Sequence, residues 1–236
     1  MSIKAVLFDL DATLLPMDQN EFIEEYFKSL SAKMAKYGYE PKKLVEAMWS
    51  GVKAMVLNTG DKTNEQSFWN EFKAIFGDKA LKDVEIHKDY YENDFDSLKK
   101  VCGYTPKSND LVKHLKEKGI KVVLATNPVY PLIATEKRIA WAGLDKNDFE
   151  LVTTYENSCH CKPNPKYYNE ILEKLNLKPN ECVMVGNDAQ EDMIAEELGI
   201  KVFLLTDNLL NPKNLDISKY PQGSFEELNS YLNSLI

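Results

Sequence analysis

The chain has 236 residues, of which 44% are hydrophobic and 28% are charged, and this composition is typical of a globular protein. Its 29 Lys and Arg residues against 37 Asp and Glu residues give a net charge of -8. This acidic balance, without a basic cluster, argues against binding to nucleic acid. The N-terminus carries no apolar segment of the signal type and the chain has only four cysteines, so we expect a cytoplasmic protein without a membrane span or disulfide scaffold.

The N-terminal part of the sequence predicts one strand followed by a helical block. Residues 3–8 are apolar except for Lys4, which is typical of a buried strand. Apolar residues then recur at helical spacing in three segments that begin near residue 18, at Pro41 and near residue 64. Because no strand pattern occurs between residues 18 and 101, we expect an all-helical domain inserted after the first strand.

Strands and helices alternate from residue 105 to the C-terminus. The strand patterns cover residues 120–125, 151–154, 182–185 and 200–205, and the helical patterns cover residues 108–118, 132–142, 165–175, 191–198 and 225–235. Such alternation predicts an α/β fold with a doubly wound parallel sheet. We therefore predict a core domain of residues 1–17 and 102–236 and a helical domain of residues 18–101. No glycine pattern of a dinucleotide-binding fold or phosphate-binding loop occurs in the sequence.

Two aspartates follow the first predicted strand. Side chains alternate along a strand, so the carboxylates of Asp9 and Asp11 lie on the same side if the extended geometry continues. Ligands bind beyond the carboxyl ends of strands in open parallel sheets. Taken alone, the pair is equally well explained as two solvated residues that open a turn.

Polar residues also follow the second strand and precede a helix further along the chain. Thr126 and Asn127 offer a hydroxyl and a carboxamide that can hold phosphate oxygens, although an ordinary Thr-Asn-Pro turn is the better explanation when they are taken alone. Pro163 disfavours helical geometry at Lys162, which leaves an ammonium in an extended segment, suited to neutralising a phosphoryl group. A solvated lysine is the alternative.

Two more aspartates follow the strand at residues 182–185. Asp188 is a candidate Mg²⁺ ligand, because this cation prefers carboxylate oxygen. Asp192 lies four residues later and shares a helix face with Asp188 if the helix has begun. An acidic first helical turn that favours the helix dipole is the alternative interpretation.

The joint pattern resembles the haloacid dehalogenase-like hydrolase superfamily, with motifs that cover nearly the whole chain. The matching segments are Asp9-x-Asp11-x-Thr13, Thr126-Asn127, Lys162-Pro163-x-Pro165 and Gly186-Asn187-Asp188-x-x-x-Asp192. The resemblance implies a Rossmann-like core with a helical cap inserted after the first motif, as in phosphoglycolate phosphatase-like members. It also implies catalysis of phosphate-ester hydrolysis.

The resemblance assigns a role to each matching residue. Asp9 would be the nucleophile that forms an aspartyl-phosphate, and Asp11 the general acid and then the base. The implied cofactor is Mg²⁺, held by Asp9, the backbone carbonyl of Asp11 and Asp188. Binding of the phosphoryl oxygens would fall to Thr126, Asn127 and Lys162, with Thr13 and Asp192 in supporting positions.

Three functions remain open from the sequence. An aspartate at position 11 argues for hydrolysis of a small phosphorylated metabolite, with neither nucleic acid nor a membrane as partner and an undetermined oligomeric state. A mutase of the β-phosphoglucomutase type would keep the same aspartate. A non-catalytic module that binds a phosphorylated metabolite is the third possibility.

Three further features of the sequence bear on the site. Ala12 stands where many relatives carry glycine, and it would be strained if the backbone there needs a positive φ. Within the predicted cap, six residues are candidates for substrate contact or for simple packing and solvent exposure: Trp49, Lys53, Asn58, Lys62, Phe68 and Trp69. Adjacent residues such as Cys159, His160 and Cys161 cannot easily converge on one metal ion, so we do not expect zinc there.

Overall fold

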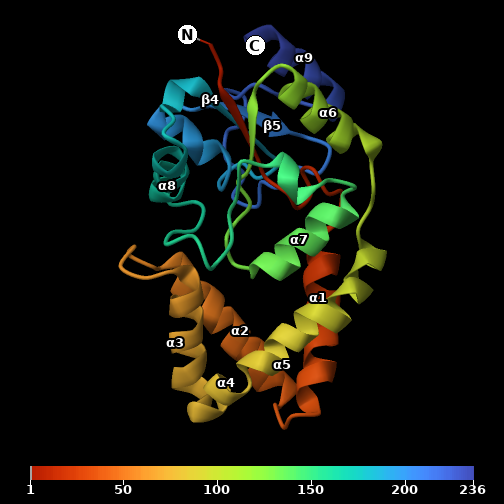
Figure 1. The fold of residues 1–236 in the computed structure, drawn as a ribbon, viewed down its shortest axis with the longest axis vertical. Coiled ribbons are helices and arrows are strands. Elements are labelled where there is room, and N and C mark those ends of the chain that lie inside the picture. Colours follow the sequence, from red (N-terminus) through yellow and green to blue (C-terminus); the bar gives the residue numbers. More distant parts are fainter. Residues whose placement is uncertain (1) are drawn as a thin grey trace.

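A six-stranded parallel sheet forms one end of the molecule in the computed structural model, which describes residues 2–236 (Figure 1). The strand order in space is β3-β2-β1-β4-β5-β6. The sheet and its flanking helices confirm the predicted α/β fold with a doubly wound parallel sheet. The strands are β1 (Ala5–Phe8), β2 (Lys121–Leu124), β3 (Leu151–Val152), β4 (Cys182–Gly186), β5 (Lys201–Leu205) and β6 (Gln222–Gly223).

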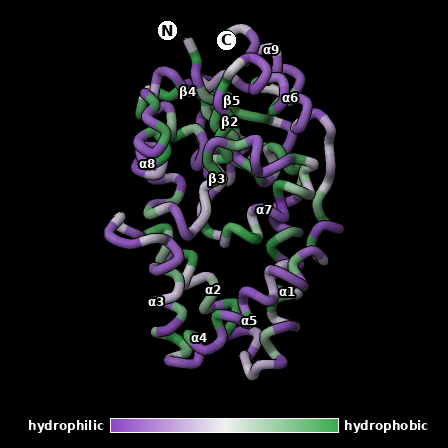
Figure 2. Tube along the Cα trace, viewed as in Figure 1, coloured by the Kyte–Doolittle hydropathy of each residue, from purple (hydrophilic) through white to green (hydrophobic). Residues whose placement is uncertain are grey.

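Helices cover both faces of this sheet because successive strand residues alternate between two cores. Val6 and Phe8 pack in one core with apolar residues of α6 (Pro106–Glu117), α7 (Leu132–Trp141) and α9 (Phe225–Leu235). Their neighbours Ala5 and Leu7 pack in the other core with α8 (Pro165–Leu175) and the 3₁₀ helix η5 (Met193–Leu198). Figure 2 shows the resulting hydrophobic strands in the interior of the core.

The helical segment between β1 and α6 forms the opposite end of the molecule (Figure 1). An aspartate caps its first helix, since the Asp18 carboxylate accepts the backbone N–H groups of Asn20 and Glu21. A proline begins the second helix, and a capping box of Thr63 and Gln66 begins the third. Its elements are α1 (Gln19–Ala35), α2 (Pro41–Val56), α3 (Asn64–Phe76), α4 (Asp78–Lys82), α5 (Val84–Asp89), η1 (Tyr90–Asp94) and η2 (Phe95–Val101).

The structure differs from the sequence-based expectation in two places near the C-terminus. The two-residue strand β6 was not expected, because Gln222 and Gly223 carry no apolar pattern. The predicted helix over residues 191–198 begins later, as the 3₁₀ helix η5, because the Asp188 carboxylate holds the preceding residues in a turn. Two short 3₁₀ helices, η3 (Lys146–Asp148) and η4 (Pro179–Glu181), lie in connections of the core. No helix within residues 2–236 combines the length and the apolar character needed to cross a bilayer.

Candidate active site

The strand order places three of the predicted motifs at one edge of the sheet. Strand β1 lies between β2 and β4, and Phe8 is opposite Leu124 on one side and Val185 on the other. The residues that follow these strands therefore leave the sheet at the same level. This is the position where the strand order of a doubly wound parallel sheet reverses, which opens a crevice for a ligand.

A buried lysine joins the first motif to the fourth. The Lys162 ammonium lies 2.9 Å from Oδ1 of Asp9 and 2.7 Å from Oδ1 of Asp192, and the lysine side chain is 1% exposed. Burial raises the pKa of Asp9 to about 7, although the positive charge of Lys162 opposes that shift. The nucleophile candidate thus lies in a poorly solvated position beside a fixed cation.

The loop after β4 is built around Asp192. Its Oδ2 accepts the backbone N–H of Asp188 at 2.9 Å, while its Oδ1 faces Lys162. A Cβ on Gly186 would lie 2.0 Å from Asp192 Oδ2, so only glycine permits this approach. Asp188 accepts the N–H groups of Gln190 and Glu191 through one carboxylate oxygen. The second oxygen makes no hydrogen bond within the described residues, and burial raises the pKa of Asp188.

A hydrogen-bond chain also ties the loop after β1 to the loop after β4. Thr13 donates its hydroxyl proton to Oδ1 of Asn187 at 3.0 Å, and the Asn187 carboxamide donates to the backbone carbonyl of Asn208 at 2.8 Å. Asn208 in turn donates to the carbonyl of Ala12. Ala12 has a φ of 61°, so the left-handed conformation that the sequence analysis raised as a source of strain is present.

The carboxylate of Asp11 pairs with an arginine that the sequence analysis did not single out. Arg138 of α7 has a fully buried side chain and donates from Nη1 to Oδ2 of Asp11. Its guanidinium also donates to the Thr135 hydroxyl at 3.2 Å and lies 4.4 Å from the centroid of the Tyr130 ring. The other carboxylate oxygen of Asp11, Oδ1, is buried and has no partner among residues 2–236.

A second residue missed by the sequence analysis is Glu191. Its carboxylate accepts a hydrogen bond from the Asn127 carboxamide at 2.9 Å, and burial raises its pKa to about 8. The carbonyl oxygen of the same Asn127 side chain is buried without a hydrogen bond in the described part of the chain. Thr126, 3% exposed, lies next to it. These polar groups form the floor on which a ligand can be held.

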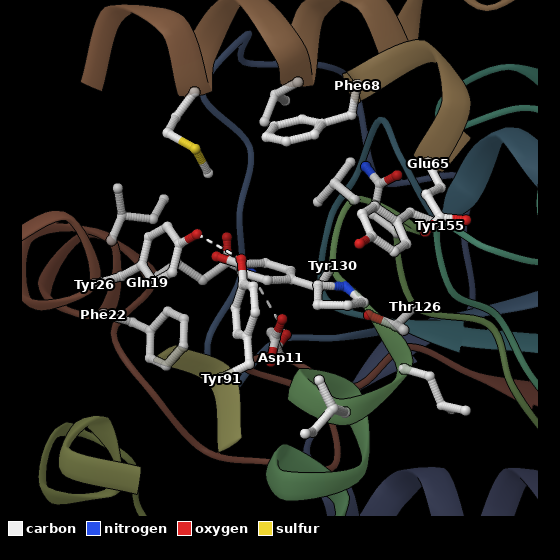
Figure 3. Close-up of a pocket in the computed structure, with 18 of the residues that line it drawn as sticks. Asp11, Gln19, Phe22, Tyr26, Glu65, Phe68, Tyr91, Thr126, Tyr130 and Tyr155 are labelled. Carbon is white, nitrogen blue, oxygen red and sulfur yellow. Dashed lines mark hydrogen bonds between the residues drawn. The ribbon is translucent and has the colours of Figure 1, made fainter. Parts of the chain in front are cut away.

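A cavity of about 670 Å³ lies between this floor and the helical segment. Its floor includes Asp9, Asp11, Thr126, Asn127 and Asp188. Lys162 lies beneath them, in contact with Asp9. Figure 3 shows aromatic side chains facing the space above Asp11 and Thr126.

The candidate cap contacts divide into two groups. The cavity is lined by Trp49, Phe68 and Trp69 but not by Lys53. The remaining pair lies elsewhere, since Asn58 and Lys62 line a separate small depression. In the segment Cys159-His160-Cys161, His160 pairs through Nδ1 with Glu170, and Cys161 accepts a hydrogen bond from Asn64.

A family model described as haloacid dehalogenase-like hydrolase matches residues 3–198, and the chain belongs to this family of hydrolases. The PpaX pyrophosphatase of Bacillus cereus (strain G9842) is 27% identical over 201 residues, which cover 85% of this chain and 82% of that protein. A crystal structure of a HAD phosphatase from Thermococcus onnurineus superposes with a TM-score of 0.60 at 23% identity, covering 98% of both chains. The HAD-hydrolase YfnB from Bacillus subtilis, solved bound to magnesium, has a TM-score of 0.58 at 17% identity and covers 99% of this chain and 100% of its own. The two structures share the fold with this chain.

Proposed function

We propose that this chain is a Mg²⁺-dependent phosphatase that hydrolyses a small phosphorylated metabolite through an aspartyl-phosphate on Asp9. The observation that carries the proposal is the carboxylate of Asp9 on a cavity floor, with the buried ammonium of Lys162 2.9 Å from one oxygen. The other oxygen makes no hydrogen bond within the described residues, which leaves it available for attack on phosphorus. The pyrophosphatase and phosphatase names of the similar proteins support the same class of reaction.

The residues of this chain divide the proposed reaction into two steps. Asp9 attacks the phosphorus, and the bond between phosphorus and the ester oxygen breaks as Asp11 gives that oxygen a proton. Asp11 then takes a proton from water, whose oxygen attacks the phosphorus and releases phosphate from Asp9. Arg138 holds one oxygen of Asp11, so the unpartnered Oδ1 is the atom we assign to proton transfer.

Three groups around Asp9 would hold the phosphoryl oxygens. Thr126 and Asn127 supply a hydroxyl and a carboxamide, and Lys162 supplies a positive charge that Asp192 positions. Because Lys162 is buried, its attraction for a dianionic phosphoryl group is weakly screened by water. We assign these residues to positioning and to stabilising negative charge in the transition state.

The donor set fits a magnesium ion. No three Asp, Glu, His or Cys side chains converge on a metal position within residues 2–236, so the protein ligands would be two carboxylates and a backbone carbonyl. Asp188 presents an oxygen without a hydrogen bond there, and the carboxylate of Asp9 and the backbone carbonyl of Asp11, which accepts a hydrogen bond from Gln19 at 3.4 Å, would complete the set. Mg²⁺ commonly binds through one or two carboxylates together with water and substrate phosphate. When bound, it would neutralise charge between Asp9 and the incoming phosphate.

We assign residues 18–101 to a cap domain that closes the site from above. The helices α1, α2 and α3 supply Phe22, Trp49 and Phe68 to the cavity wall, opposite the strand ends of the core. A wall of this kind excludes water from the phosphoryl group and contacts the part of the substrate that leaves. We assign residues 1–17 and 102–236 to the core domain.

The test is phosphate release from a panel of phosphorylated metabolites by the native chain and by Asp9→Asn, with Mg²⁺ or with chelator. We expect release that requires Mg²⁺ and falls at least about 1,000-fold in the variant, because removal of a nucleophile costs that order of rate. Asp78→Asn, an exposed aspartate of α4, is the matched control and should be fully active. Release that survives Asp9→Asn would contradict the mechanism, and conversion of one sugar phosphate into its isomer would favour a mutase.

A further inference from the structure

The wall of the cavity is unusually aromatic for a site that takes a small polar metabolite. Nine of its lining side chains are Phe, Tyr or Trp, and its volume of about 670 Å³ is in the range of sites for drug-sized ligands. On one side Tyr26 and Tyr91 pair through their hydroxyls at 2.8 Å, so that one of the two hydroxyl protons is not used by the pair. Phe68 and Tyr155 stand on the other side (Figure 3).

The same wall carries almost no positive charge. Lys88 is the one lysine among the cavity-lining residues that the structure describes, and it is exposed with its ammonium 3.8 Å from Glu92. His87 is buried among aromatic rings, where burial lowers its pKa to about 4 and keeps it neutral near pH 7. Apart from Lys88, a second phosphate or a carboxylate on the substrate would find no counterion among the described residues that line the cavity above its floor.

Two glutamates of the cavity wall also disfavour a second anionic group on the substrate. Glu65 and Glu156 both line the cavity on the side of Tyr155. Glu156 is engaged with the N–H of Leu132, but the side chain of Glu65 has no hydrogen bond within the described chain, and burial together with the charge of Glu156 raises its pKa. This rim repels negative charge and would accept a hydrogen-bond donor.

We infer that the substrate is a phosphate monoester whose leaving alcohol carries a large planar aromatic group and no second acidic group. The inference rests on the proposed phosphatase function and narrows its substrate class. Ring faces of the cavity wall would stack on such a group, whereas a two-carbon or three-carbon alcohol would leave most of the wall in contact with water. Pyrophosphate, the substrate named for the Bacillus cereus relative, has no aromatic or other apolar group that could contact this wall.

The test compares kcat/KM for 1-naphthyl phosphate and riboflavin 5′-phosphate with that for phosphoglycolate and inorganic pyrophosphate, all with Mg²⁺. Acetyl phosphate, a small and reactive compound without a ring, serves as the reference for the phosphoryl-transfer groups. We expect the two aromatic esters to exceed phosphoglycolate and pyrophosphate by about 100-fold, a ratio that one well-filled apolar pocket can supply. Equal or higher values for the two small anions would overturn the inference.

Two variants, one in α2 and one at its C-terminal cap, test whether the cavity determines the preference for an aromatic substrate. Val52 lines the cavity, so Val52→Trp fills part of it and should lower the ratio of 1-naphthyl phosphate to acetyl phosphate turnover by about tenfold or more. Leu57→Trp adds the same ring at the C-terminal cap of the helix, where the side chain is 65% exposed, and should leave the ratio unchanged. An unchanged ratio in Val52→Trp would contradict the inference.

A binding measurement separates this inference from the proposed function. The Asp9→Asn chain is titrated with 1-naphthyl phosphate and with phosphoglycolate in the presence of Mg²⁺, which needs no turnover. Tighter binding of 1-naphthyl phosphate supports the aromatic site whether or not the native chain hydrolyses any compound. If the native chain hydrolyses none of the compounds, including acetyl phosphate, the phosphatase proposal is contradicted but the aromatic site is not. Tighter binding of phosphoglycolate overturns the inference even if hydrolysis is observed.

Discussion

Arg138 is the residue whose surroundings most clearly constrain the chemistry of Asp11. Its fully buried guanidinium pairs with the Asp11 carboxylate, whose side chain is 21% exposed. Arg138→Met leaves a part-buried carboxylate without a partner, so we expect the free energy of unfolding to fall by about 3–5 kcal/mol and kcat to fall with it. Lys137→Met, on the same helix, is the control and should cost about 1 kcal/mol or less, because its partner Asp96 is 58% exposed.

Urea unfolding measures the stability of each variant, and kcat is measured separately on the folded protein in the absence of urea. Arg138→Lys keeps the positive charge but loses the planar guanidinium. We therefore expect its free energy of unfolding and its kcat to lie between those of Arg138→Met and those of the native chain. A stable Arg138→Met chain with native kcat would show that the pair does not position Asp11. Sequence reasoning had no signal for this residue, because its partner is 127 positions away.

The aromatic cluster of the helical segment makes stability depend on pH. The ring of His87 lies edge-on to Trp69 and Phe72, with centroids 5.2 and 5.1 Å away, and its Nε2 is buried without a partner in the described residues. Burial lowers its pKa from 6.5 to about 4 in the folded chain. Between these pH values the unfolded chain binds a proton that the folded chain does not, so stability falls as the pH falls through this window.

We expect the contribution of His87 to change by up to about 1.4 kcal/mol per pH unit between pH 6.5 and 4 and to be constant above that range. Urea unfolding of the native chain and of His87→Phe at several pH values measures it, since the difference between the two curves removes other titrating groups. His114→Gln, on α6 of the core, is the matched control and should retain the native slope. Parallel curves for the native chain and His87→Phe would contradict the assignment.

Local patterns predicted the elements of the whole molecule better than they predicted its site. Pro41 and the capping box of Thr63 specify their helix starts through neighbouring residues, and those starts were predicted. Asp9, Thr126 and Asp188 each follow a strand, and they lie at one edge of the sheet, as the sequence analysis expected. The short strand β6 depends on pairing with β5, and the aromatic cavity depends on how the helical segment packs on the core. Neither leaves a periodic signal in the sequence.

The attachment of the helical segment to the core depends on Asn64 at the first position of α3. This residue is fully buried, and its carboxamide donates to the carbonyls of Pro128 and His160 at 3.3 Å and to the sulfur of Cys161 at 3.2 Å. Its backbone N–H and that of Glu65 bond to core carbonyls at 2.8 Å. One residue therefore links the proposed cap to the loops that carry Asn127 and Lys162.

Loss of this link should loosen the proposed cap without unfolding the core. Asn64→Ala leaves buried carbonyls without donors, so we expect a loss of about 1–3 kcal/mol in stability. The backbone amides of residues 64 and 65 should then exchange with solvent at least about tenfold faster, because local opening becomes easier. Hydrogen exchange measured by mass spectrometry on this segment checks the prediction, with Asn70→Ala in the middle of α3 as the control. Unchanged protection in Asn64→Ala would mean that packing of the aromatic wall, rather than this hydrogen-bond cluster, holds the helical segment to the core.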